Sequence, residues 1–174
     1  LLVAYGWRVL PFGTKGSWGW QGNAMLIRGD VALRETAAIS LPGLEPRGAI
    51  RAEFDTALGP LRVVGLHLGL LRRFRLLQLR AVSRGLRDLP QMPTLLAGDF
   101  NEWGPVSALD TATPGLRFCD SNHSFPAPRP IAALDRFALG PGLLAKSTGV
   151  WSKRPAQIAS DHLPVWIDLQ AERG

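Results

Sequence analysis

One short segment of this sequence has the residue types and the spacing of a catalytic site: Gly98-Asp99-Phe100-Asn101. It follows the apolar run Thr94-Leu95-Leu96-Ala97, which is typical of a buried strand. The Asp99 carboxylate and the Asn101 amide should therefore project from the carboxyl end of that strand, where layered α/β proteins usually carry functional side chains. A carboxylate can accept a proton, and an amide can position a polar group without adding charge.

Three further candidates are spread along the chain: His67, Asp135 and Ser160-Asp161-His162. Each of them also has a purely structural explanation. A histidine between two leucines is commonly a hydrogen-bonded core residue, Asp135 can pair with the adjacent Arg136, and Asp161 can cap a loop. Asp-Phe-Asn itself can form an Asx turn. Taken singly, none of these candidates defines a site.

The composition is that of an ordinary globular domain. The chain has 174 residues, of which 46% are hydrophobic and 20% are charged. The 20 basic and 14 acidic residues give a net charge of +6 and a pI near 10.7, so the surface should attract phosphates or other polyanions. Genome composition explains the excess of arginine equally well. The single cysteine, Cys119, excludes an intrachain disulfide and a cysteine-rich zinc site, and we expect it to be a small buried apolar side chain.

No apolar stretch is long enough to span a bilayer, because the longest candidate, residues 61–71, is interrupted by Arg62 and His67. The sequence therefore predicts a soluble protein with no integral membrane segment, and the cytoplasm is the favoured compartment. The first residue is Leu1, and no charged region precedes the apolar residues that follow, as a signal peptide requires. We expect the sequence to begin in the middle of a domain.

Strands are predicted over the first third of the chain, separated by turn residues. They cover residues 23–28, 31–39, 47–55 and 61–66, and we expect them to form an antiparallel meander. In the third segment, apolar and charged residues alternate, which indicates one buried face and one solvated face. The apolar set is Ile50, Ala52 and Phe54, and the charged set is Arg51, Glu53 and Asp55.

The period changes to that of a helix over residues 72–89. The expected core positions are Leu76, Leu79, Val82 and Leu86, and the arginines on another face are Arg73, Arg80, Arg84 and Arg87. We interpret these arginines as a solvated face rather than a nucleic-acid footprint, because such faces are common. Further on, the sequence predicts a short helix at 105–111, a loop-rich region, and strands at 131–139, 143–150 and 162–169.

The order and spacing of the motifs resemble those of the endonuclease/exonuclease/phosphatase superfamily. The resemblance rests on a histidine at a strand end, Gly-Asp-Phe-Asn, Leu-Asp-Arg-Phe at 134–137 and Ser-Asp-His-Leu-Pro-Val at 160–165, and it extends from about residue 22 to 169. It also includes the segments at 22–26 and 47–51. It implies a single α/β domain over residues 1–174: a two-sheet, mostly antiparallel β-sandwich flanked by helices in four layers, α/β/β/α.

The resemblance also implies metal-dependent hydrolysis of a phosphate ester, a phosphodiester or a monoester, by in-line attack of water. A divalent ion, Mg²⁺ or Mn²⁺, held by oxygen ligands would neutralise the phosphate. Asp99 would orient or deprotonate the water and, with Asp161, lie at the metal. Asn101 would position the water and a phosphoryl oxygen. The implied substrates are nucleic acid, phospholipid or sugar phosphate, and this choice stays open.

Three other residues complete the set that the resemblance implies. His162 would contact the phosphate or act as the base, and Asp135 would hold its second ring nitrogen, which fixes the tautomer and favours the charged form. His67 would bind phosphate or protonate the leaving oxygen. Arg72, which follows His67 closely in the sequence, is an additional candidate for phosphate binding.

One departure from the superfamily opens an alternative. Its first strand, with an asparagine, and the following metal-ligand glutamate are expected before residue 22 and are not found there; neither Glu35 nor Glu45 occupies that place. We therefore expect an N-terminal piece to be absent. The competing hypothesis is a non-catalytic pseudoenzyme that binds phosphate or nucleic acid. A third hypothesis, a nucleic-acid-binding protein without chemistry, rests on the arginine helix and leaves Asp99 and Asp161 unexplained.

Substrate specificity is expected to lie in two loops, residues 5–21 and 121–130. The first contains three tryptophans, Trp7, Trp18 and Trp20. They could stack a base or meet a lipid surface, and packing at a sheet edge is the interpretation we prefer.

Overall fold

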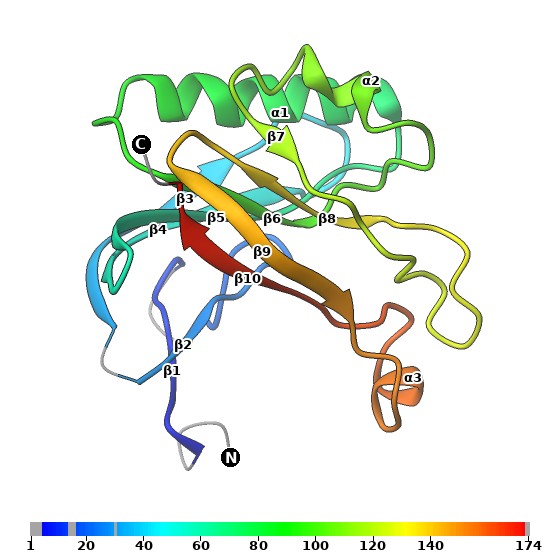
Figure 1. The fold of residues 1–174 in the computed structure, drawn as a ribbon. Coiled ribbons are helices and arrows are strands. Elements are labelled where there is room, and N and C mark those ends of the chain that lie inside the picture. The colour runs from blue at the N-terminus through cyan, green and yellow to red at the C-terminus, as the bar shows by residue number, and fades with distance from the viewer. Residues whose placement is uncertain (1–4, 14–16, 30, 173–174) are drawn as a thin grey trace.

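The computed structural model describes residues 5–13, 17–29 and 31–172. A six-stranded mixed sheet forms its centre (Figure 1). Its order is β3-β4-β5-β6-β8-β7, and only β5 and β6 are parallel neighbours. The bounds of these strands are β3 (Ala32–Ser40), β4 (Gly48–Thr56), β5 (Gly59–His67), β6 (Thr94–Asp99), β7 (Arg117–Phe118) and β8 (Asp135–Leu139).

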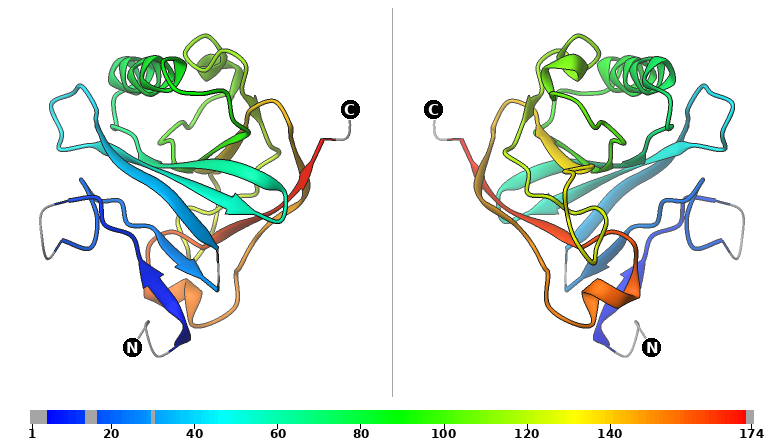
Figure 2. Two further views of the ribbon diagram at one scale, coloured as in Figure 1. Left: turned by 90° about the vertical axis from the view of Figure 1, so that its left-hand side faces the viewer. Right: turned by 90° about the vertical axis from the view of Figure 1, so that its right-hand side faces the viewer.

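Two small antiparallel sheets pack on one face of the large sheet, and two helices, α1 (Arg72–Arg87) and α2 (Ser107–Asp110), cover the other face (Figure 2). One small sheet pairs β1 (Trp7–Val9) with β2 (Leu26–Arg28), and the second pairs β9 (Leu143–Val150) with β10 (Val165–Ala171). A third helix is α3 (Ala156–Ala159). Of the helices in the described ranges, none is long and apolar enough to cross a membrane. The predicted α/β sandwich is confirmed.

The large sheet separates two regions of the core. Above it, α1 packs Leu79 and Val82 against Val64 and Leu96. Below it, the small sheets contribute two clusters: one joins Leu10, Phe12 and Ile27 to the underside of β4, and the other joins Leu143, Val165 and Ile167 to β6 and β8. Burial of these apolar faces supplies the main favourable free energy of folding.

Helix α1 follows the predicted periodicity closely. Leu79 and Val82 are buried, and Leu76 and Leu86 pack against the same cluster. The four arginines predicted to form a solvated face, Arg73, Arg80, Arg84 and Arg87, are exposed. The helix ends at Arg87, shortly before Pro90, which cannot continue it.

The predicted meander is correct for β3, β4 and β5 and wrong for the strand before them. Segment 23–28 contributes only β2, which pairs with β1 in the other layer, because Met25 and Ile27 pack under β4. Strand β1 lies in a segment that we interpreted as a loop, and β7 lies in the region interpreted as loop-rich. The strand predicted at 131–139 begins only at Asp135, and the last strand covers Val165–Ala171.

The prediction that one face of β4 is solvated is also wrong in part. Ile50, Ala52 and Phe54 are buried as expected, and Asp55 is exposed, but Arg51 and Glu53 are buried too. Glu53 accepts from Arg62 Nε at 2.8 Å and pairs with Arg51, and Arg51 Nη2 lies 2.7 Å from Glu35 Oε1. Opposite charges on three adjacent strands thus satisfy one another, which makes burial of the charged face tolerable.

Shortening a core side chain of α1 should weaken the whole fold. We expect Leu79→Ala to lower the free energy of unfolding by about 2–5 kcal/mol, because it leaves a cavity between the helix and the sheet. Urea denaturation measures this change. The control is Leu77→Ala on the same helix, where the side chain is 44% exposed and the loss should stay within about 1 kcal/mol. Equal losses in the two variants would contradict the assigned packing of α1.

Candidate active site at the carboxyl ends of β5 and β6

Three of the predicted side chains lie in one row across the large sheet. Parallel pairing sets His67 of β5 opposite Asp99 of β6, and antiparallel pairing sets Asp99 opposite Asp135 of β8. The parallel pair requires a crossover, which α1 provides, so the carboxyl ends of β5 and β6 meet at the same edge. His67 Nε2 lies 3.5 Å from Asp99 Oδ2. The structure therefore brings together residues that lie 32 and 36 positions apart in the sequence.

Gly98 allows the close approach of β6 to β5. It has φ 144°, and a Cβ added at this position would lie 1.9 Å from the carbonyl oxygen of Leu66. Only glycine fits there. The side chains of the two residues after Gly98 have different surroundings. Asp99 lines a pocket, whereas Phe100 is fully buried, with its ring 5.3 Å from that of Phe118. Phe100 thus anchors the segment in the core.

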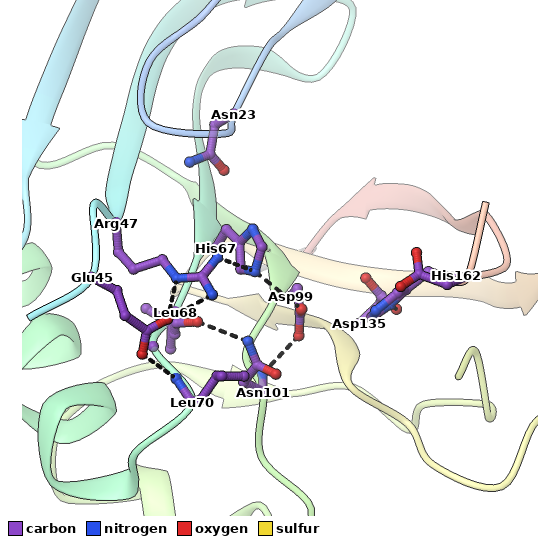
Figure 3. A network of polar contacts seen from close by, with 12 residues as sticks. Asn23, Glu45, Arg47, His67, Leu68, Leu70, Asp99, Asn101, Asp135 and His162 are labelled. Atoms are coloured by element: carbon purple, nitrogen blue, oxygen red, sulfur yellow. Dashed lines mark hydrogen bonds and ion pairs between the residues drawn. The ribbon is translucent and has the colours of Figure 1, made fainter. Parts of the chain in front are cut away.

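The Asx turn and the functional site coexist in this segment. The backbone N–H of Asn101 donates to Asp99 Oδ1 at 2.8 Å, which is the Asx turn considered from the sequence. Asn101 has φ 51°, and its Nδ2 donates to the carbonyl of Leu68 at 2.8 Å. These bonds fix the amide beside the end of β5 (Figure 3). The turn is therefore the means by which Asp99 and Asn101 are oriented.

His162 reaches the row from the far end of the chain. Its Nδ1 lies 2.7 Å from Asp135 Oδ2, and the Ser124 hydroxyl donates to the same oxygen at 2.5 Å. Asp135 therefore pairs with His162, and not with the adjacent Arg136, whose Nη2 donates to the carbonyl of Glu102 at 3.2 Å. The predicted contact between Asp135 and the second ring nitrogen of the histidine is present.

A pocket of about 470 Å³ lies over this row. Six of the seven predicted site residues line it: His67, Asp99, Asn101, Asp135, Asp161 and His162. Arg72 does not line the pocket; its side chain is exposed, with Nε 4.0 Å from Glu102 Oε2. The other lining residues are Leu70, Trp103, Phe125, Leu134 and Ser160.

The two histidines differ in their electrostatic surroundings. Burial, together with the neighbouring Arg47, lowers the pKa of His67. Burial also opposes the charged form of His162, but the hydrogen bond to Asp135 and the charges of Asp135, Asp99 and Asp161 outweigh it and raise the pKa of His162. Burial and the charge of Asp135 raise the pKa of Asp99. One histidine is thus biased toward the neutral form and the other toward the cation, a difference characteristic of acid–base sites.

Arg47 and Glu45 are site residues that the sequence analysis missed. Arg47 Nη1 lies 2.5 Å from His67 Nε2, and Glu45 Oε2 accepts from Arg47 Nε and Nη2 at 3.0 and 2.8 Å (Figure 3). A guanidinium can only donate, so Nε2 of His67 accepts and the proton of the neutral ring is on Nδ1. No local motif indicated this contact, because it joins the start of β4 to the end of β5.

Glu102 is another residue near the site that the sequence analysis did not identify. It is buried, and its carboxylate accepts from Arg75 Nη2 at 3.1 Å and from the backbone N–H of Gly104 at 2.9 Å. Burial opposes its charged form, but these two bonds and the arginine charges outweigh it and lower the pKa of Glu102. The sequence did contain one indication that such a buried acidic partner exists: Arg75 lies on the face of α1 that carries Leu79 and Val82. A charge on that face requires a buried partner.

The oxygen donors in the pocket are of the kind that magnesium uses. The described residues contain no group of three or more His, Cys, Asp or Glu side chains placed to hold a metal. Of the three carboxylates that line the pocket, Asp135 is bonded to His162, and Asp99 and Asp161 are not. Mg²⁺ is commonly bound by one or two carboxylates, with water and substrate phosphate filling its other positions. The donor set therefore fits such an ion.

A search for relatives by sequence finds an uncharacterized bacterial protein. No protein-family model matches the chain. The chain is 31% identical over 165 residues to the uncharacterized protein YbhP of Escherichia coli K12, and the match covers 87% of this chain. The chain spans 63% of the length of that relative.

Solved structures match the fold over nearly the whole chain. An endonuclease/exonuclease/phosphatase family protein from Bacteroides thetaiotaomicron superposes with a TM-score of 0.77 at 18% identity, covering 95% of this chain and 75% of that one. The mannosyl-6-phosphatase Bt3783 of the same species gives a TM-score of 0.73 at 20% identity, covering 94% and 77%. The resemblance of the motifs is thus confirmed at the level of three-dimensional structure: this chain has the endonuclease/exonuclease/phosphatase fold.

Proposed function

We propose that this protein is a divalent-metal-dependent phosphoesterase that hydrolyses a phosphate ester by in-line attack of water. The observation that supports this most directly is the convergence of His67, Asp99, Asn101, Asp135, Asp161 and His162 on one pocket from four separate segments of the chain. Each residue alone has a structural explanation. Structural roles do not require all six to share one cavity, whereas phosphate hydrolysis does.

Each side chain has a defined task in this proposal. The Asp99 carboxylate orients the attacking water and accepts its proton, since burial holds its pKa above the ordinary value. The Asn101 amide donates to the carbonyl of Leu68, and the backbone N–H of the same residue donates to Asp99; held in this way, the amide positions the water and a phosphoryl oxygen. His162, held by Asp135, contacts the phosphate as a cation. His67 contacts the phosphate or the leaving oxygen, and Arg72 attracts the substrate from outside the pocket.

Asp99 and Asp161 are the residues that would hold Mg²⁺ or Mn²⁺. When bound, the ion supplies charge neutralisation at the phosphate and at the leaving oxygen. Without it, two carboxylates next to a phosphate would repel the substrate, so the acidic side of the pocket supports metal dependence. The fold neighbour whose name states a phosphatase agrees with the proposed reaction class. The non-catalytic alternative, a phosphate-binding or nucleic-acid-binding pseudoenzyme, predicts binding without turnover.

Removing the Asp99 carboxylate or the His162 imidazole should abolish most of the turnover. We expect Asp99→Ala and His162→Ala each to lower kcat/KM for a chromogenic phosphodiester, assayed with Mg²⁺ or Mn²⁺, by about 100-fold or more, because each loses a group that acts in proton transfer or on the phosphate. Chelation with EDTA should remove the activity, and added Mg²⁺ should restore it.

The control for that assay is Asp110→Asn, which changes an exposed carboxylate on α2 outside the pocket and should leave kcat/KM unchanged. The assay uses the natural protein with its own N-terminus. Metal-independent turnover, or full activity in Asp99→Ala and His162→Ala, would refute the proposed reaction. Phosphate binding without any turnover would favour the pseudoenzyme.

The proton affinity of His162 should depend on Asp135. We expect Asp135→Asn to lower the pKa of His162, because the amide removes the negative charge that stabilises the imidazolium. NMR titration of the histidine Hε1 signals measures the shift, and Asp110→Asn should leave it unchanged. An unaltered midpoint in Asp135→Asn would show that the contact does not hold the imidazolium.

The contact between His162 and Asp135 should also make the free energy of unfolding depend on pH. A raised folded-state pKa means that the fold binds the His162 proton more tightly than the unfolded chain does. The stabilisation is therefore complete below the unfolded-state pKa, which is near 6.5, and disappears as the pH rises through the folded-state pKa. The difference in unfolding free energy between the wild type and Asp135→Asn should shrink over that range.

A further inference from the structure

The pocket is lined by apolar side chains that the proposed reaction does not use. Besides the six polar side chains proposed to act on the phosphate, its lining includes Leu70, Trp103, Phe125 and Leu134, which we call the apolar wall. The total volume of about 470 Å³ is far more than a phosphate group needs and lies within the usual range of about 300–1,000 Å³ for whole small-molecule ligands. The apolar wall therefore has room for a substituent on the phosphate.

The apolar wall begins directly beside a residue that contacts the phosphate. The ring of Phe125 lies 4.8 Å from that of His162, and Trp103 lies 5.9 Å from Phe125 at an interplanar angle of 86°. The three rings thus form a continuous series that leads from His162 to the apolar wall. A group bonded to a phosphate at His162 can reach the indole ring of Trp103.

Two residues of the apolar wall carry large exposed apolar side chains. Trp103 is 62% exposed and Leu70 is 64% exposed. Large apolar surfaces at the rim of a pocket are a mark of ligand binding. The right-angled contact with Phe125 leaves most of the indole uncovered. These side chains therefore offer a ligand apolar area that the fold itself does not bury.

The loop that carries Trp103 is anchored on both sides of the indole. Glu102, the preceding residue, is buried and bonded to Arg75, and its Oε1 also accepts from the N–H of Gly104, the following residue. Trp103 is thus exposed on a fixed backbone. Binding to a pre-organised aromatic surface costs little conformational entropy.

We propose that the apolar wall binds a flat aromatic group carried by the substrate, which is then an aryl or nucleoside ester of phosphate. This inference rests on the proposed function. A rigid ring stacks on the indole without losing rotamer freedom. A sugar phosphate gains less from this wall, because hydroxyl groups interrupt the apolar surface that its ring can offer to Trp103 and Phe125.

Phosphonates test the proposal, because their carbon–phosphorus bond cannot be hydrolysed. Isothermal titration calorimetry with Mg²⁺ should show that phenylphosphonate and the 5′-phosphonate analogue of thymidine monophosphate bind at least about 10-fold more tightly than methylphosphonate, within the range of one aromatic stack. The two aromatic ligands distinguish an aryl group from a nucleobase. Hexylphosphonate provides a flexible apolar group of similar size.

Variants of Trp103 test whether this residue causes the preference for an aromatic phosphonate. Trp103→Ala should remove the advantage of phenylphosphonate over methylphosphonate, and Trp103→Phe should retain most of it, because phenylalanine still offers a ring. The matched control is Trp151→Ala, which removes another tryptophan, 53% exposed, that does not line the pocket; it should preserve the preference. Affinity for methylphosphonate should stay unchanged in all three variants.

Equal binding of phenyl-, hexyl- and methylphosphonate would overturn the proposal. Tighter binding of hexylphosphonate than of phenylphosphonate would overturn it as well, since that result indicates an acyl chain or a lipid. These outcomes differ from failure of the proposed function. An aromatic preference without turnover would refute only the phosphoesterase, and turnover without the preference would refute only the aromatic specificity of the wall.

Discussion

The parallel pairing of β5 with β6 is the interaction on which the rest of the site depends. It sets His67 opposite Asp99, and the antiparallel addition of β8 brings Asp135 into the same row. Parallel neighbours need a crossover, so α1 is required both to bury the upper face of the sheet and to return the chain. Gly98 makes the pairing possible, because any side chain there would collide with Leu66.

Buried charge supports the site from two sides. Glu102, paired with Arg75 from α1, fixes the backbone on both sides of Trp103, and Glu45 holds Arg47 against His67. Such pairs contribute little net stability, because desolvation offsets their attraction. Their effect is geometric. The row of His67, Asp99 and Asp135 is held in position because its neighbours are bonded to helices and loops outside it, as a pre-organised site requires.

Under the proposed function, the pocket has to meet two requirements. A phosphate needs charge, hydrogen-bond donors and a place for a cation, whereas an aromatic group needs a flat apolar surface. The row across β5, β6 and β8 would provide the first, and loop residues such as Trp103 and Phe125 would provide the second. In that case the chemistry lies on the sheet and the specificity on loops, the usual division of tasks in layered enzymes.

The sequence by itself determined the period of α1, because this depends only on the spacing of apolar residues along the chain. Through the resemblance of its motifs to a known superfamily, it also indicated the α/β sandwich and six residues of the pocket. Tertiary structure alone decided the pairing of β1 with β2, the burial of Arg51 and Glu53, and the contacts of Arg47 and Glu102. It also directed Arg72 away from the pocket and Trp103 into it. Each of these outcomes depends on a partner distant in the sequence, and the pairing of distant segments is set by packing and charge compensation across the whole fold, which no local pattern records.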